Sequence, residues 1–115
     1  MNDKNSILLI SDDDDLSKVI ESKLIFLRAN DSIVLSGYKD AISNLKYVNS
    51  DIVLIHENNS QQVTLDLIKK IRELKNVCII LLVNNYDKDM ILACYDAGID
   101  DFTFSTAADF ELVIT

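Results

Sequence analysis

Short, wholly apolar runs alternate along this chain with segments whose apolar residues recur every three or four positions. An unbroken apolar run is typical of a strand buried on both faces, and the spacing of three and four is typical of a helix with one buried stripe. Regular alternation of the two favours a parallel sheet covered by helices on both faces. We therefore predict an α/β fold with strands at residues 7–11, 33–36, 52–55, 77–83 and 102–104.

Four segments between these strands carry the helical spacing. We expect Gly98 to end the fourth of them in the left-handed conformation that glycine adopts most easily. After the last strand, residues 107–115 begin a fifth helix whose apolar residues stop early, so we expect an N-terminal fragment of a longer protein. The apolar positions are Leu16, Val19, Ile20, Leu24 and Leu27; Ala41, Ile42, Leu45 and Val48; Leu67, Ile68, Ile71 and Leu74; and Met90, Ile91, Cys94 and Ala97.

The length of 115 residues predicts one domain that buries roughly two-thirds of its unfolded surface without a disulfide or metal. Cys78 falls in an apolar strand and Cys94 on an apolar helix face, so we expect two reduced core thiols, as in a cytoplasmic protein. No stretch approaches the ~20 apolar residues of a membrane helix, and the first residues lack the features of a signal peptide.

The net charge of −8, with four aspartates in a row at positions 12–15, repels phosphate backbones. We therefore expect this domain neither to bind nucleic acid by itself nor to contact membranes. The loops contain no proline and turn on Asn, Asp and Ser, as at Asn84-Asn85.

The aspartate run follows the first strand, and His56 follows the third. Since parallel strands end at the same edge of a sheet, at least one or two of these carboxylates should lie near His56. Asp14 and Asp15 suit the first turn of the next helix, where carboxylates complement the helix dipole. Asp12 and Asp13 alternatively suit a divalent cation such as Mg²⁺.

Three segments resemble the receiver domains of two-component response regulators, in the same order and along nearly the whole chain. Residues 7–16 are similar to the first strand and acidic pair of that family, and residues 51–56 to its third strand. Gly98-Ile99-Asp100-Asp101-Phe102 is close to its Gly-Ala-Asp-Asp-Tyr segment and is the most specific match. The resemblance implies a doubly wound (βα)5, flavodoxin-like fold with strand order 2-1-3-4-5 and an incomplete fifth helix.

The resemblance also shows which site residues this chain has lost. A receiver takes a phosphoryl group on an aspartate, assisted by an acidic pair with Mg²⁺, a hydroxyl residue and a lysine. Of the matching positions only Asp12 keeps the residue type of the family, so we predict that the pocket cannot be phosphorylated at this position. The phosphoacceptor position is His56, the acidic pair Ser11 and Asp12, the hydroxyl Val83 and the lysine Ser105.

Several uses of the altered pocket stay open. His56 could be a simple structural replacement that pairs directly with Asp12, a pH sensor, or a site of phosphohistidine formation. A cation held by Asp12, Asp13 and His56 is another alternative. Phe102 stands at the position of the family's switch aromatic and could equally be a plain core residue.

We therefore predict a degenerate receiver domain that is not an enzyme and needs no cofactor, Mg²⁺ at Asp12 and Asp13 being the one exception considered. It should signal without phosphorylation, by contact with its own output domain or a partner regulator. A homodimer through the fourth helix, fifth strand and fifth helix is expected. The alternative is a conventional Mg²⁺-dependent receiver that accepts phosphate at His56 or a nearby carboxylate.

Overall fold

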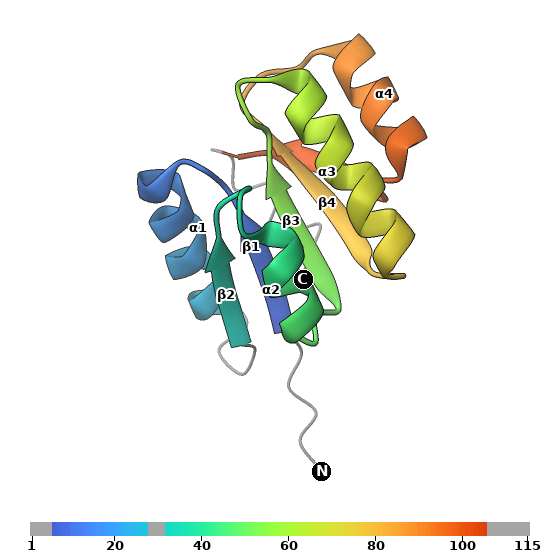
Figure 1. Ribbon diagram of the computed structural model, residues 1–115. Coiled ribbons are helices and arrows are strands. Elements are labelled where there is room, and N and C mark those ends of the chain that lie inside the picture. Colours follow the sequence, from blue (N-terminus) through green and yellow to red (C-terminus); the bar gives the residue numbers. More distant parts are fainter. Residues whose placement is uncertain (1–5, 28–31, 106–115) are drawn as a thin grey trace.

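The computed structural model describes residues 6–27 and 32–105, with side chains undescribed at positions 26 and 27 (Figure 1). Strands and helices alternate throughout these residues. The strands are β1 (Ser6–Ile10), β2 (Ser32–Ser36), β3 (Ile52–His56), β4 (Cys78–Val83) and β5 (Asp101–Phe104). The helices are α1 (Asp14–Leu27), α2 (Ala41–Tyr47), α3 (Gln61–Leu74) and α4 (Lys88–Ala97).

All five strands are parallel and form one sheet in the order β2-β1-β3-β4-β5, which confirms the predicted fold. The register pairs Ile10 with Ile55 and His56 with Leu82, so the carboxyl ends of the strands meet at one edge. His56 is the last residue of β3, one residue further than the predicted strand. The predicted fifth helix falls in residues 107–115, outside the described residues.

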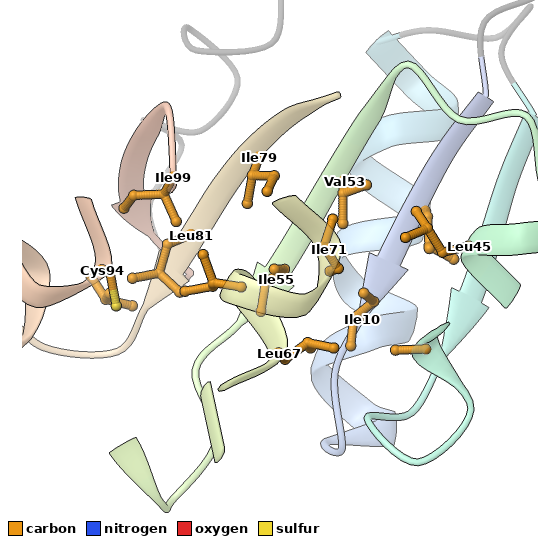
Figure 2. Packing of buried hydrophobic residues seen from close by; sticks show 14 of the residues in the cluster. Ile10, Leu45, Val53, Ile55, Leu67, Ile71, Ile79, Leu81, Cys94 and Ile99 are labelled. Carbon is orange, nitrogen blue, oxygen red and sulfur yellow. The ribbon is translucent and has the colours of Figure 1, made fainter. Parts of the chain in front are cut away.

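Side chains on alternate positions of β1, β3 and β4 enter two separate cores. The larger core lies under α2, α3 and α4, which cover the face turned toward the viewer in Figure 1. Figure 2 shows strand residues such as Ile55 and Leu81 meeting helix residues such as Leu67, Ile71 and Cys94 in this core. On the opposite face Ile20 and Leu24 of α1 pack against the other set of strand side chains. The continuous apolar runs of β1, β3 and β4 are explained by burial on both faces.

The helix ends follow the local sequence. Asp13 accepts a hydrogen bond from the Leu16 backbone N–H at 3.0 Å, and Asp14 and Asp15 occupy the first turn of α1, as predicted. Gly98 ends α4 with a φ of 131°, a positive value that confirms the expected glycine conformation. Within the described residues, no helix has the length and apolar character needed to span a membrane.

The prediction for the two cysteines is right for Cys94 and wrong for Cys78. Cys94 is buried under α4, but Cys78 is exposed. Cys78 is the first residue of β4 and stands at the amino edge of the sheet, so an apolar run does not ensure burial at its first position. Neither thiol forms a disulfide.

Arg72 of α3 joins three segments at this amino edge. Its guanidinium donates from Nε and Nη2 to the Gly98 carbonyl oxygen at 3.1 and 2.6 Å, and from Nη1 to the Val77 carbonyl oxygen at 2.8 Å. Nη2 also lies 3.0 Å from Asp100 Oδ2, an oxygen that accepts from the Ile79 N–H at 2.8 Å. The planar donor fork of arginine therefore fixes the turn between α4 and β5 against β4.

Candidate functional site

Four polar residues stand at the carboxyl ends of the four adjacent strands β1, β3, β4 and β5. They are Ser11, His56, Asn84 and Ser105. Backbone hydrogen bonds carry the ladder just past the strand ends, from Ser11 N to Ser36 O at 2.9 Å and from Ser105 N to Val83 O at 2.8 Å. The rigid sheet therefore determines where each of these side chains begins.

Hydrogen bonds connect the four side chains into one line across the sheet edge, which we call the edge network (Ser11, His56, Asn84 and Ser105). Ser11 Oγ lies 3.0 Å from His56 Nδ1, and His56 Nε2 lies 2.9 Å from Asn84 Oδ1. Ser105 Oγ donates to the same Asn84 oxygen at 2.8 Å. Three of the positions predicted for the degenerate pocket thus meet in one network.

The network accommodates a neutral imidazole without an unsatisfied atom. In the neutral ring that donates from Nε2 to Asn84 Oδ1, Nδ1 accepts from the Ser11 hydroxyl, which also lies 3.4 Å from the Asp13 carbonyl oxygen. The Ser11 oxygen in turn accepts from the Asp13 N–H at 3.0 Å. His56 is only 6 % exposed, and both of its ring nitrogens have partners, as buried polar groups require.

Asp12 does not pair with His56, so the predicted direct contact is wrong. Its Oδ1 accepts from the Tyr38 N–H at 2.9 Å, and its Oδ2 accepts from Asn58 Nδ2 at 2.8 Å. Gly37 allows this approach, because a Cβ at position 37 would lie 3.2 Å from Asp12 Oδ1. The carboxylate therefore ties the β2–α2 loop to the β3–α3 loop instead of serving the imidazole.

Tyr38, in the β2–α2 loop, forms a hydrogen bond with the backbone of His56 next to Thr64 of α3. Its hydroxyl donates to the His56 carbonyl oxygen and lies 3.5 Å from Thr64 Oγ1. Burial raises the pKa of the Tyr38 phenol above its ordinary value of 10.0. The neutral phenol is thus favoured and can keep donating to the carbonyl.

A pocket of about 180 Å³ opens beside the edge network. The described residues that line it include three carboxylates and no lysine or arginine. Burial raises the pKa of Glu57 above its ordinary value of 4.5, while an Asn84 backbone hydrogen bond and His56 act in the opposite direction. An uncompensated carboxylate lining disfavours an incoming phosphate dianion. The lining residues are Asp12, Asp13, His56, Glu57, Asn58, Asn59 and Asn84.

The alternative cation site at Asp12, Asp13 and His56 lacks its imidazole ligand, because both ring nitrogens lie at hydrogen-bond distance from other side chains. In the described ranges, no group of three His, Cys, Asp or Glu residues is arranged to hold a metal ion.

Asn84 is the member of the network that sequence reasoning missed. The Asn84-Asn85 pair was interpreted as a turn, although Asn84 follows β4 directly, as Ser11 follows β1. That position was the available signal. Val83, the residue that was predicted for the pocket, instead packs in the larger core.

Phe102 is half-buried and lies between two tyrosine rings. Its centroid is 6.3 Å from that of Tyr95 in an edge-to-face arrangement and 6.5 Å from that of Tyr86. Tyr86 before α4 and Tyr95 on α4 are exposed, and so is Leu92, which stands three residues before Tyr95 and therefore on the same side of α4. The aromatic side chains therefore connect β5 to the outer surface of α4.

No family model matches the chain, and no curated protein matches it. Solved structures match closely in fold. A response regulator receiver domain protein (CheY-like) from Methanospirillum hungatei JF-1 is 13 % identical with a TM-score of 0.82, over 96 % of this chain and 88 % of that one. A two-component response regulator from Clostridium difficile is 22 % identical with a TM-score of 0.79, over 96 % and 90 %.

An orphan response regulator of H. pylori is 17 % identical with a TM-score of 0.77, over 95 % of this chain and 89 % of that one. Sequence identity at this level shows the fold alone. The chain has the five-stranded fold of the response regulator receiver, or CheY-like, domains.

Proposed function

We propose that this chain is a receiver-type signalling domain that takes no phosphoryl group and acts through contacts with other protein domains. The observation that carries the proposal is the edge network. At the position where a receiver would present a reactive aspartate, His56 is buried and hydrogen-bonded through both ring nitrogens. A side chain held in this way supports a structural role.

Phosphotransfer at this edge would lack the groups that stabilise the transferring phosphoryl. That reaction depends on metal and ammonium charges placed where negative charge accumulates. Ser105 brings a hydroxyl to the end of β5 and spends its donor on Asn84. Among the described residues, the lining of the neighbouring pocket offers only carboxylates and amides besides the imidazole. The domain is therefore proposed not to be an enzyme.

The hydrogen bonds of His56 and Asp12 do not favour the conventional alternative, in which His56 or a nearby carboxylate is phosphorylated. Attack by Nδ1 would break its hydrogen bond with the Ser11 hydroxyl. Attack by Nε2 would require this nitrogen to lose its proton, which breaks its hydrogen bond with Asn84. Both oxygens of Asp12 already accept hydrogen bonds from two loops. Each route disrupts a satisfied buried group.

The surface proposed for protein contacts comprises Tyr86, Leu92, Tyr95 and Phe102 on α4, its preceding loop and β5. Exposed aromatic and aliphatic side chains that lie together are typical of interaction sites. We propose a homodimer through this surface, or docking of the chain's own output domain or a partner regulator.

Sedimentation equilibrium tests this proposal with a matched pair of variants. Leu92 on α4 and Ile25 on α1 are almost equally exposed, at 55 % and 53 %. We expect Leu92→Ser to weaken self-association about a hundredfold, because a symmetric dimer buries the leucine of both copies and each contributes about 1.5 kcal/mol. Ile25→Ser should leave self-association unchanged.

Acetyl phosphate with Mg²⁺ should leave the wild-type association constant unchanged. A dimer that forms only with the phosphodonor would contradict the proposed phosphate independence. Equal effects of the two serine substitutions, or a monomer at every concentration, would rule out this dimer surface.

A further inference from the structure

We infer that a hollow between α1 and the end of β2 binds a small zwitterion, with one ammonium and one carboxylate group, and passes its occupancy to the edge network through Ser11. The inference deepens the proposed function, because it supplies an input signal to a domain without phosphorylation. The binding itself depends only on the hollow.

The hollow has a volume of about 220 Å³ and is separate from the pocket beside His56. Its lining combines three buried serines with two charged residues of α1 and the end of β2. Pockets for drug-sized ligands start at roughly 300 Å³, so this space suits a smaller molecule of amino-acid size. The lining residues are Ser11, Asp14, Ser17, Lys18, Leu35, Ser36 and Gly37.

Ser17 is the serine with hydrogen-bonding capacity left for a ligand. It is only 6 % exposed, and its hydroxyl makes no hydrogen bond within the described part of the chain. Ser36 Oγ, by contrast, donates to the Gly37 carbonyl oxygen at 2.8 Å and accepts from Asn44 at 2.9 Å. The oxygen of this hydroxyl is open to the hollow, because among the described residues only the Ser50 hydroxyl is fully buried without a partner. An occupant of the hollow can therefore form a hydrogen bond with Ser17 directly.

The charges at the hollow select the kind of occupant. Asp14 and Lys18 are four residues apart and therefore on one side of α1, yet they form no ion pair with each other in the residues that the structure describes. A lone anion would face Asp14, and a lone cation would face Lys18. A molecule that carries both charges satisfies both residues, and Leu35 offers apolar contact for its carbon atoms.

Ser11 connects the hollow to the edge network. It lines the hollow, and its hydroxyl lies 3.0 Å from His56 Nδ1. Gly37, on the other wall, sits against the carboxylate of Asp12. An occupant that shifts Ser11 therefore changes the hydrogen bond on which the orientation of the imidazole depends.

Titration of the full chain with glycine, followed by ¹H–¹⁵N NMR, tests the inference. We expect saturable shifts at Ser17 and Gly37 and a change in the ring nitrogen signals of His56. Acetate and methylammonium carry one of the two charges each and should bind at least about tenfold more weakly, because each lacks one charge-assisted contact.

Variants separate the binding from its transmission. Ser17→Ala, Asp14→Asn and Lys18→Gln should each raise the Kd for glycine about tenfold, whereas Asp15→Asn, on the same turn but outside the lining, should not. Ser11→Ala should keep the shifts at Gly37 and remove the response of the His56 ring.

Absence of saturable shifts with glycine would overturn the inference, as would equal binding of acetate or methylammonium, or shifts confined to the pocket at Glu57 and Asn84. Loss of the ring response alone in wild type would overturn the transmission through Ser11. These readouts involve no phosphate, so phosphorylation of the domain would defeat the proposed function and leave the glycine result unaffected.

Discussion

Arg72→Met is expected to lower the free energy of unfolding by about 2 to 4 kcal/mol. The substitution keeps much of the apolar stem but removes every donor that holds the turn between α4 and β5. The carbonyl oxygens of Gly98 and Val77 lose these donors, at a cost of about 1 to 3 kcal/mol for each group left unsatisfied. Asp100 retains its bond from the Ile79 N–H, which limits the loss on that side.

Urea unfolding of matched variants isolates the contribution of the guanidinium. Lys70→Met removes an exposed cation from the same helix and should change the stability by less than about 0.5 kcal/mol. Arg72→Lys should fall between the two, because an ammonium cannot reproduce the planar fork. If Arg72→Met and Lys70→Met had the same effect, the contacts of Arg72 would contribute nothing to stability.

His56→Asp is expected to lower the free energy of unfolding by about 2 to 4 kcal/mol without metal, and Mg²⁺ should recover part of this loss. The shorter side chain gives up the contacts with Ser11 and Asn84 and adds a buried carboxylate beside Asp12 and Asp13. Three carboxylates at one sheet edge form a site that favours Mg²⁺. Binding to the native state then raises the stability by mass action.

His56→Asn is the matched control, since it also shortens the side chain but adds no charge. Thermal unfolding with and without Mg²⁺ should show a raised midpoint for His56→Asp and no change for His56→Asn or wild type. A wild-type midpoint that rises with Mg²⁺ would mean that the unaltered pocket already holds the ion, contrary to the neutral edge network.

The fold was predictable because hydrophobic periodicity is a local signal. The runs that became β1, β3 and β4 are short and apolar at successive positions, which is typical of strands covered on both faces. Whether a particular side chain at the end of a strand is buried was less predictable. Cys78 continues the apolar run of β4 but lies at the sheet edge, where the register and not the composition decides its exposure.

The site was predictable in position but not in pairing. His56 and the aspartates after the first strand were placed at one edge because parallel strands end there, and the resemblance to receiver domains added Ser11 and Ser105. The hydrogen-bond partner of His56 was not predictable, because both oxygens of Asp12 accept hydrogen bonds from Tyr38 and Asn58 in two other loops. Long-range partners of this kind leave no mark in the local pattern, and Asn84 was hidden by its resemblance to a turn residue.

The most direct test of the account is the intact mass of the wild-type chain after incubation with acetyl phosphate and Mg²⁺, beside a conventional receiver domain as a positive control. The account predicts an unchanged mass, because both ring nitrogens of His56 are hydrogen-bonded and the described residues lining the pocket include no lysine or arginine to stabilise the transferred phosphoryl group. A gain of one phosphoryl group that disappears in His56→Ala would contradict it.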